Sequence, residues 1–354
     1  MKMKETLILK VDSDKPNEEI IQVAAKIIQK GGLVAFPTET VYGLGADALN
    51  ARAVLALFEA KMRPLDNPPI VHVASIKEVY NLVRGVSKKA ELLMKEFWPG
   101  PLTLIFKRSN IIPDVTVAGL DTVAIRMPKH KVALALITQS GCSIAAPSAN
   151  LAGKPSPTTA KHVYEDLNGR IDIILDGGPT RIGVESTVLD MSGSEPVVLR
   201  PGGTTFEELK EVLVDVRLHP FVEAEKEVPL EKARSPGMKH RHYSPKAEVV
   251  LVEGSVPSLI AKVNELAASY GQKGVKVGIL ATDETYSSYK APVVKSLGSR
   301  INLATIAQNL FRLLREVDSQ KVDVILVEGV PSEGLGLAVM NRLRKASGYH
   351  IIKA

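Results

Sequence analysis

The sequence is poor in cysteine, and this scarcity limits the chemistry open to the chain. Cys142 is the single residue of its type. One cysteine excludes an intramolecular disulfide and any zinc site built on a cluster of cysteines. We therefore expect a reducing, cytoplasmic location, and we interpret Cys142 as a small core residue rather than a nucleophile.

Long apolar runs and aromatic residues are scarce as well. The apolar residues 7–9 are too few for a signal-peptide core, and no stretch reaches the length of a membrane span. Aromatic residues make up 5% of the chain, which leaves little material for stacking single-stranded bases. The formal net charge of +6 is compatible with a polyanionic partner but does not establish one.

Several motifs of common enzyme classes are missing. The sequence has no P-loop, no Gly-x-Ser-x-Gly elbow and no His-Glu-x-x-His zinc motif. Gly334-Leu335-Gly336 lacks the third glycine and the acidic partner of a dinucleotide fingerprint. His240 and His242 have no accompanying carboxylate–histidine set, so we expect no protein metal site.

The chain does contain a long alternation of short apolar runs and helical patterns. Up to about residue 215, strands are expected at 33–36, 70–73, 102–107, 122–126, 143–146, 172–176, 186–190 and 197–200. Several of these strands follow one another through turns with no crossover helix between them. Because parallel strands need such a crossover, the pattern predicts a mixed α/β sheet that is partly antiparallel.

A second part of the chain follows a segment rich in Pro, Glu and Lys, residues 217–246, which we interpret as a long linker. Beyond it, apolar strands are expected at 248–252, 275–280 and 322–327, and an apolar helical stripe runs from Leu303 to Val317. Strands alternating with helices are typical of a small parallel three-layer domain. The predicted division is therefore 1–216, 217–246 and 247–354.

The most informative polar segment is residues 37–43, directly after an apolar strand. Pro37 cannot donate to a sheet ladder, so the strand should end there. The side chains of Thr38, Thr40 and Tyr42 then become free to face a ligand. The alternative is an ordinary turn in which the threonines cap a following helix.

A pair of cations follows soon after. Lys61 and Arg63 come at the end of an expected helix over 53–58, and prolines follow them. A lysine offers a point charge and an arginine a planar fork, so the pair suits phosphate oxygens. The alternative is a solvated helix C-terminus at which both cations complement the helix dipole.

Other polar residues interrupt or end the expected strands. Ser148 and Asn150 either offer polar groups to a nucleotide or form a plain turn. Arg126 closes an apolar strand, as a carboxylate clamp or as an edge residue in water. A lone strand histidine such as His72 is more often structural than functional.

Taken together and in order, these segments resemble the threonylcarbamoyl-AMP synthases. The matching segments are Pro37–Leu44, Lys61–Pro64, Pro147–Asn150, Glu185–Thr187, Leu199–Gly202 and His242–Pro245. The resemblance covers almost the whole chain. It implies the long form of the family, in which a YrdC-like domain with a mixed twisted sheet and helices is joined by an ordered linker to a smaller Rossmann-like parallel α/β domain.

The resemblance also implies a reaction and its site residues. L-threonine, bicarbonate and ATP would be condensed to L-threonylcarbamoyl-AMP with release of pyrophosphate, the first stage of t6A formation on tRNA. Threonine would be held by Thr40, His72, Arg126 and Ser186. ATP would be surrounded by Lys61, Arg63, Asn67, Thr122, Ala146, Ser148, Asn150, Ser156, Arg200 and Tyr243. Lys61 and Arg63, together with a phosphate-bound Mg²⁺, would stabilise the charge that develops in the transition state.

Partners follow from the same resemblance. The product would be handed to a tRNA threonylcarbamoyl transferase complex, with weak contact to tRNA, and the linker around Tyr243 would act as a lid. The role of Glu39 stays open between orienting its turn and catalysis. The alternative function is a tRNA- or RNA-binding module associated with translation, motivated by the positive charge. A related carbamoyltransferase of hydrogenase maturation is set aside, because one cysteine cannot build its zinc fingers.

Overall fold

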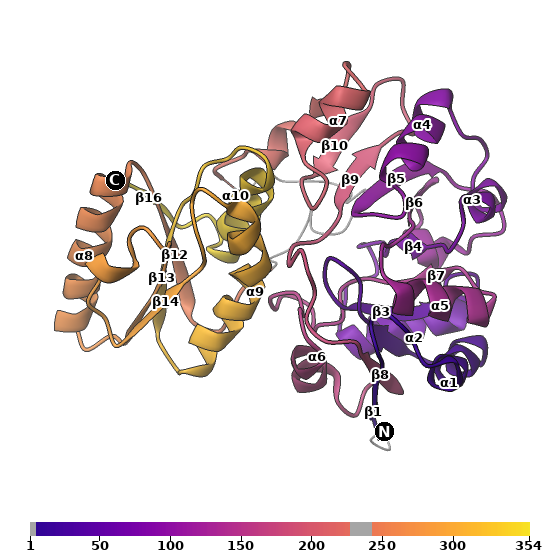
Figure 1. The fold of residues 1–354 in the computed structure, drawn as a ribbon, viewed down its shortest axis with the longest axis horizontal. Helices are drawn as coiled ribbons and strands as arrows, with labels where there is room; N and C mark the ends of the chain where they lie inside the picture. The colour runs from indigo at the N-terminus through magenta and orange to yellow at the C-terminus, as the bar shows by residue number, and fades with distance from the viewer. Residues whose placement is uncertain (1–4, 227–242) are drawn as a thin grey trace. The chain divides into compact units, whose positions relative to one another are not determined.

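The chain divides into two compact units in the computed structural model, which describes residues 5–226 and 243–354 (Figure 1). The first unit contains residues 5–152 and 156–222. The second contains residues 153–155, 223–226 and 243–354. Among the described residues, no helix is both long and apolar enough to span a bilayer.

The first unit is built on one large mixed sheet. Its strands are β1 (Leu7–Lys10), β2 (Val34–Phe36), β3 (Gly43–Asp47), β4 (Val71–His72), β5 (Leu102–Lys107), β6 (Thr122–Arg126), β7 (Ile144–Ala145), β8 (Ile173–Asp176), β9 (Thr187–Asp190), β10 (Val197–Arg200) and β11 (Arg217–Leu218). The sheet has eleven strands in the order β1-β8-β2-β3-β7-β4-β6-β5-β9-β10-β11. Pairs such as β2–β3 and β5–β6 are antiparallel, whereas β1–β8 and β5–β9 are parallel. The predicted mixed sheet is confirmed.

Helices pack against this sheet and bury their apolar stripes. They are α1 (Glu18–Gln29), α2 (Ala51–Lys61), α3 (Ile76–Leu82), α4 (Lys88–Phe97), α5 (Lys131–Ser140), α6 (Ala160–Leu167) and α7 (Phe206–Val212), with short 3₁₀ turns η1 (Asp114–Val117) and η2 (Pro220–Val222). Helix α1 starts at Asn17, whose side chain accepts hydrogen bonds from the amides of Glu19 and Ile20. Its buried face, Ile21, Ala24, Ala25 and Ile28, packs in one core cluster with residues of α5.

The structure corrects the expectations after Pro37. Residues 43–47 form strand β3, which runs antiparallel to β2, so no helix follows for the threonines to cap. A Cβ on Gly45 would lie 2.8 Å from Ile144 and 2.9 Å from Phe36, so this glycine serves close packing inside the sheet. In the sequence the same glycines look like a turn.

The predicted linker also begins later than expected. Arg217 and Leu218 pair with β10 as strand β11, and Phe221 and Val222 are buried in the first unit. A two-residue strand is too short to leave a pattern in the sequence. Residues 227–242 of the predicted linker lie outside the described residues.

The second unit is a parallel three-layer domain. Its strands are β12 (Glu248–Glu253), β13 (Val277–Ala281), β14 (Val293–Ser296), β15 (Val324–Glu328) and β16 (Ile351–Lys353), and its helices are α8 (Val256–Gln272), η3 (Tyr286–Ser288), α9 (Leu303–Ser319) and α10 (Leu335–Ala346). All neighbours in the order β14-β13-β15-β12-β16 are parallel. Figure 1 shows α8 on one face of the sheet and α9 with α10 on the other. The three predicted strands and the stripe on α9 are confirmed, whereas the edge strands β14 and β16 were not predicted.

Candidate active site

Polar side chains that are almost fully buried lie in the loop between β2 and β3. Thr38, Glu39 and Thr40 are 5% exposed or less. The hydroxyl oxygens of Thr38 and Thr40 lie 2.8 Å apart, and the Thr38 hydroxyl donates to the carbonyl of Val41 at 2.7 Å. The loop is therefore held by its own hydroxyl groups. The amides of residues 182 and 183 donate to the carbonyls of Glu39 and Thr40, which fixes it further.

Arg126, the last residue of β6, reaches this loop. Its Nη1 donates to the Thr40 hydroxyl at 3.0 Å, and its Nε donates to the carbonyl of Gly100 at 3.1 Å. Its Nη2 lies 2.7 Å from Oε2 of Glu39 in an ion pair. Arg126 is 4% exposed, so the alternative of an edge residue in water is wrong. Sequence reasoning left the role of Glu39 open between orienting its turn and catalysis, and here its carboxylate pairs with the arginine.

His72 lies beside Arg126 because the parallel register of β4 and β6 pairs the two residues. It is 3% exposed, and its Nδ1 is 3.1 Å from the carbonyl oxygen of Ile70. Burial, together with the neighbouring Arg126 charge, lowers the pKa of His72 to about 3. The ring is therefore neutral at physiological pH and offers one donor and one acceptor.

A second group of buried polar residues surrounds Ser186. Its hydroxyl oxygen lies 2.8 Å from that of Thr103 on β5. Arg200, at the end of β10, donates through Nη2 to the carbonyl and hydroxyl oxygens of Ser186 at 2.9 and 3.2 Å. The structure thus brings together two predicted residues of different substrate sets. Thr103 was not predicted, although a threonine inside the apolar run 102–107 is a usable signal.

Ser156 connects this region to a buried carboxylate. Its hydroxyl donates to Oε1 of Glu185 at 2.6 Å, and both residues are at least nine-tenths buried. Glu185 belongs to a motif noted in the sequence, but no role was assigned to it. The Glu185 side chain therefore links the loop that contains Ser156 to the segment that contains Ser186.

Lys61 lies at the end of α2 and is 1% exposed, so the alternative of a solvated helix C-terminus is wrong for it. Its Nζ donates to the carbonyl oxygens of Ser148 and Asn150. The Ser148 hydroxyl donates to Oδ1 of Asn150 at 2.6 Å. Three residues predicted to surround ATP are therefore in contact.

Arg63 lies just beyond α2 and is half-buried. Its Nε donates to the carbonyl of Asn67 at 2.8 Å, and its Nη2 donates to that of Pro68 at 3.4 Å. The side chain of Asn67 is buried, and its Oδ1 has no hydrogen-bond partner among the described residues. A buried acceptor without a donor is costly unless another molecule supplies one.

The other predicted residues have simpler surroundings. Thr122 is half-buried at the start of β6, and Ala146 is buried just after β7, where its amide donates to the carbonyl of Ile70 at 2.8 Å. Tyr243 belongs to the second unit. Its ring stacks on Phe311 with centroids 5.2 Å apart, and the Arg342 guanidinium lies 5.5 Å from the ring centroid.

The arrangement in the first unit suits a small zwitterion and a phosphate chain. A buried guanidinium and a neutral imidazole lie beside hydroxyl groups at the carboxyl end of β6, which is suited to hold a carboxylate. Lys61 and Arg63 lie at the other predicted set of residues, where they would neutralise phosphate oxygens. These are groups for positioning and charge stabilisation rather than for nucleophilic attack.

Comparison with known proteins gives matches over the whole chain. Residues 26–202 match the family model described as Telomere recombination, and residues 204–348 match the model described as Threonylcarbamoyl-AMP synthase, C-terminal domain. The chain is 53% identical over 348 residues to a threonylcarbamoyl-AMP synthase of Pyrococcus abyssi, an alignment that covers 98% of this chain and 99% of that protein. It is 49% identical over 355 residues to the Bacillus subtilis protein of the same name, covering 100% of both.

The structure of this chain is also similar to solved structures. A crystal structure of P. abyssi Sua5 complexed with L-threonine has a TM-score of 0.93 and 52% identity, covering 99% of this chain and 100% of that chain. Escherichia coli YciO has a TM-score of 0.52 and 26% identity, covering 56% of this chain and 96% of that one.

Proposed function

The chain belongs to the threonylcarbamoyl-AMP synthase family, an enzyme family, and from this premise we propose which groups hold each substrate in the condensation of L-threonine, bicarbonate and ATP. The reaction forms L-threonylcarbamoyl-AMP and releases pyrophosphate. The observation that carries the assignment is the buried Arg126, held by Glu39 and Thr40.

L-threonine binds at Arg126. The Arg126 guanidinium takes the carboxylate, because a planar fork matches two carboxylate oxygens. The neutral ring of His72 and the hydroxyls of Thr40 and Ser186 supply the remaining hydrogen bonds. The relative of known structure from P. abyssi, complexed with L-threonine, supports threonine as a substrate.

ATP binds at the residues around Lys61. Lys61 and Arg63 neutralise phosphate oxygens, and Ser148, Asn150 and Ser156 provide hydrogen-bonding groups. The other residues assigned to ATP in the first unit are Thr122, Ala146, Asn67 and Arg200. Tyr243, in the second unit, stays a prediction from the family resemblance. A Mg²⁺ ion held by the ATP phosphates would supply further charge neutralisation, and the buried Oδ1 of Asn67 fits an outer contact to its hydration shell.

The chemistry needs geometry more than acid–base groups. Bicarbonate takes up a proton and loses water to give carbon dioxide. The amine of threonine adds this carbon dioxide and loses a proton, and one carbamate oxygen then attacks the α-phosphorus. The bond between this phosphorus and the oxygen that bridges it to the β-phosphorus breaks, and pyrophosphate departs with the electron pair. Arg126 and Lys61 serve this step by holding the two reactants in line, which accounts for much of the barrier reduction.

The test is a pyrophosphate-release assay with each substrate omitted in turn. Pyrophosphate should form only when L-threonine, bicarbonate and ATP are all present. Release that does not depend on threonine would refute the threonine site. Turnover with weak tRNA binding at physiological salt would reject the alternative of an RNA-binding module, because such a module needs no small substrates.

The fate of the product belongs to the same proposal. The mixed anhydride passes to a tRNA threonylcarbamoyl transferase complex, and the chain makes weak contact with tRNA in the cytoplasm. The family membership and the single cysteine support this placement. Product transfer in a reconstituted mixture with tRNA tests it.

A further inference from the structure

The connections of the second unit change direction between β13 and β15. After β13 the chain continues to β14 at one edge of the sheet, and after β15 it continues to β16 at the opposite edge. Adjacent parallel strands that are connected in opposite directions form a topological switch point. Open α/β sheets bind ligands there, beyond the carboxyl ends of the strands.

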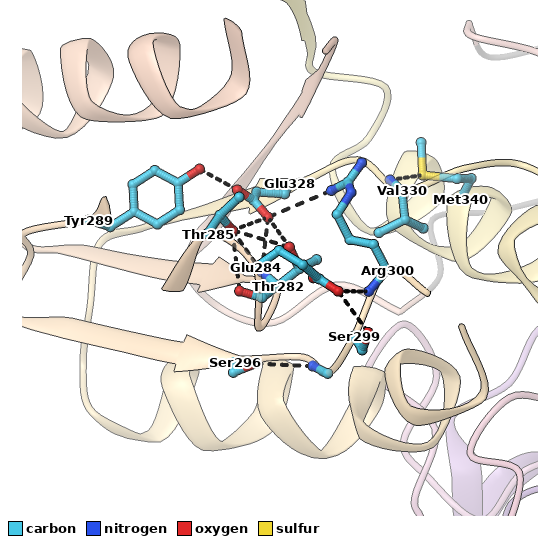
Figure 2. Close-up of polar contacts among 11 residues, drawn as sticks. Thr282, Glu284, Thr285, Tyr289, Ser296, Ser299, Arg300, Glu328, Val330 and Met340 are labelled. Atoms are coloured by element: carbon cyan, nitrogen blue, oxygen red, sulfur yellow. Dashed lines mark hydrogen bonds and ion pairs between the residues drawn. The ribbon is translucent and has the colours of Figure 1, made fainter. Parts of the chain in front are cut away.

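A buried carboxylate lies at this switch point. Glu328, the last residue of β15, is 0% exposed. Its Oε2 accepts hydrogen bonds from the amide and hydroxyl of Thr282 at 2.9 and 3.0 Å and from the Thr285 hydroxyl at 2.8 Å. Its Oε1 accepts one from the Tyr289 hydroxyl. Figure 2 shows these donors converging on Glu328 from the segment after β13.

Arg300 lies beside Glu328 without a hydrogen bond to it. Its Nη1 is 3.8 Å from Oε2 of Glu328, beyond hydrogen-bond range. This buried nitrogen has no hydrogen-bond partner among the described residues, and the side chain is 14% exposed. The charge of Arg300 is thus balanced, but its Nη1 is left without a hydrogen-bond acceptor among the described residues.

The backbone of Arg300 is held in place on the other side. Oε1 of Glu284 accepts the amide of Arg300 at 2.8 Å and the hydroxyl of Ser299 at 2.7 Å (Figure 2). A pure counter-ion for Glu328 would approach it to hydrogen-bond distance. Three other donors already occupy Oε2, which leaves Nη1 of Arg300 outside the hydrogen bonds of Glu328.

We propose that Arg300 binds the carboxylate group of a small ligand at this switch point. A planar guanidinium matches a carboxylate through two parallel hydrogen bonds. Glu328 lies beside the guanidinium and Glu284 accepts the backbone amide of the same arginine, so two anions near one cation disfavour a polyphosphate. The absence of a dinucleotide fingerprint from the sequence agrees with a ligand that carries a single negative charge. None of the residues assigned to threonine or ATP belongs to this group of side chains.

The test follows the side chain of Arg300 directly in the full-length chain. The protein is labelled with ¹⁵N-arginine, and the Nε–Hε signal of Arg300 is identified by its loss in Arg300→Lys. Sodium acetate, L-threonine, sodium phosphate and sodium chloride are then titrated at constant ionic strength. Acetate should shift the Arg300 signal saturably, with a midpoint about tenfold below that of phosphate. A still lower midpoint for L-threonine would support the site and identify amino acids as the ligand class.

The matched control is Arg312 on α9, which already donates to Glu316 at 3.0 Å and to Asn309 at 2.8 Å. Its signal should not change. A second variant, Glu284→Gln, keeps an oxygen for the Arg300 amide but removes one negative charge, so the phosphate midpoint should fall while that of acetate changes less. Equal shifts with chloride, a lower midpoint for phosphate in the unaltered chain, or no shift of Arg300 would each overturn the proposal.

Discussion

Among individual side chains, Arg126 is central to the proposed threonine site, and Glu39 orients its guanidinium. Both are charged and at least nine-tenths buried, with Nη2 and Oε2 2.7 Å apart. Breaking a buried pair by removing one charge is costly, on the order of 3–5 kcal/mol, because the other charge is left uncompensated. Glu39 is therefore a positioning residue for the threonine site.

We expect Glu39→Gln to lower kcat/KM for L-threonine by about a hundredfold, since Arg126 loses the partner that orients its guanidinium. The measurement is pyrophosphate release at varied threonine. The KM for ATP should change far less. The control is Asp14→Asn, which removes the exposed pair with Arg181 at 3.9 Å and should leave activity unchanged, because exposed pairs contribute little. A Glu39→Gln enzyme with normal threonine kinetics would contradict the positioning role.

His72 makes the stability of the first unit depend on pH. Its pKa is lowered to about 3 in the folded chain by burial and by Arg126, against about 6.5 when unfolded. Above the unfolded pKa the ring is neutral in both states, so its titration does not change the free energy of unfolding. As pH falls below it, only the unfolded state binds the proton, so the free energy of unfolding decreases by about 1.4 kcal/mol per pH unit.

We therefore expect His72→Asn, which retains a donor near the carbonyl of Ile70, to flatten this decrease between about pH 6 and about pH 4. Urea unfolding followed by the fluorescence of Trp98 measures it, because Trp98 is the single tryptophan and is buried in the first unit. His130, whose pKa is also lowered by burial, remains in both proteins and does not affect the comparison. Parallel pH curves for the two proteins would show that His72 does not titrate as described.

Sequence patterns pointed to Arg126 and Ser186 because charged or hydroxyl residues at the ends of apolar runs can be recognised from the sequence alone. Arg126 closes a run of apolar residues, and the structure buries it beside Thr40. Glu39 and Thr103 were not assigned, because their roles depend on partners far along the chain. Pairings of this kind arise only when strands from distant segments lie side by side.

Among the strands and turns, the backbone after β10 approaches the Ser186 segment very closely. A Cβ on Gly202 would lie 2.3 Å from the carbonyl oxygen of Glu185 and 2.3 Å from the carbonyl carbon of Ser186. Backbone atoms cannot yield as a flexible side chain does. The contact explains why a glycine lies two residues after Arg200, whose guanidinium donates to the same residue, Ser186.

Gly202→Ala should thus displace Ser186, destabilise the first unit by about 1–3 kcal/mol and reduce turnover. Thermal unfolding and pyrophosphate release measure the two effects. Gly193, in the turn before β10, is the matched control, because a Cβ there would meet nothing within 4 Å. Gly193→Ala should change stability by no more than about 0.5 kcal/mol. Equal effects of the two substitutions would refute the close-approach explanation.

Element prediction succeeded where the apolar pattern was long and failed where strands were short or glycine-rich. The strand over 102–107 and the stripe on α9 were evident in the sequence. Strand β3 was hidden because its glycines resemble a turn, and β11 has two residues. Neither carries enough alternation to distinguish it from a loop.

For the chain as a whole, the described part of the first unit extends to residue 222, beyond the start of the predicted linker at residue 217. Phe221 and Val222 are 6% and 1% exposed, and β11 pairs with β10. Burying a large apolar side chain contributes about 1.5–3 kcal/mol. A chain that ends at Val216 should therefore be less stable than one that ends at Val222, by roughly 3–6 kcal/mol, in urea unfolding followed by Trp98.

The chain that ends at Val222 also tests the role proposed for Tyr243. It should fold with a cooperative Trp98 transition, because three core clusters of the described residues lie wholly before residue 223, yet bind ATP more weakly since Tyr243 is absent. Tyr243→Ala in the full-length chain should weaken ATP binding to a similar degree, whereas Tyr243→Phe, which keeps the ring stacked on Phe311, separates the ring from its hydroxyl. The measurement is equilibrium binding of ATP to the unaltered chain, the truncated chain, Tyr243→Ala and Tyr243→Phe. If truncation weakens binding and Tyr243→Ala does not, another part of residues 223–354 contributes. If neither change weakens binding, ATP is held by the first unit alone.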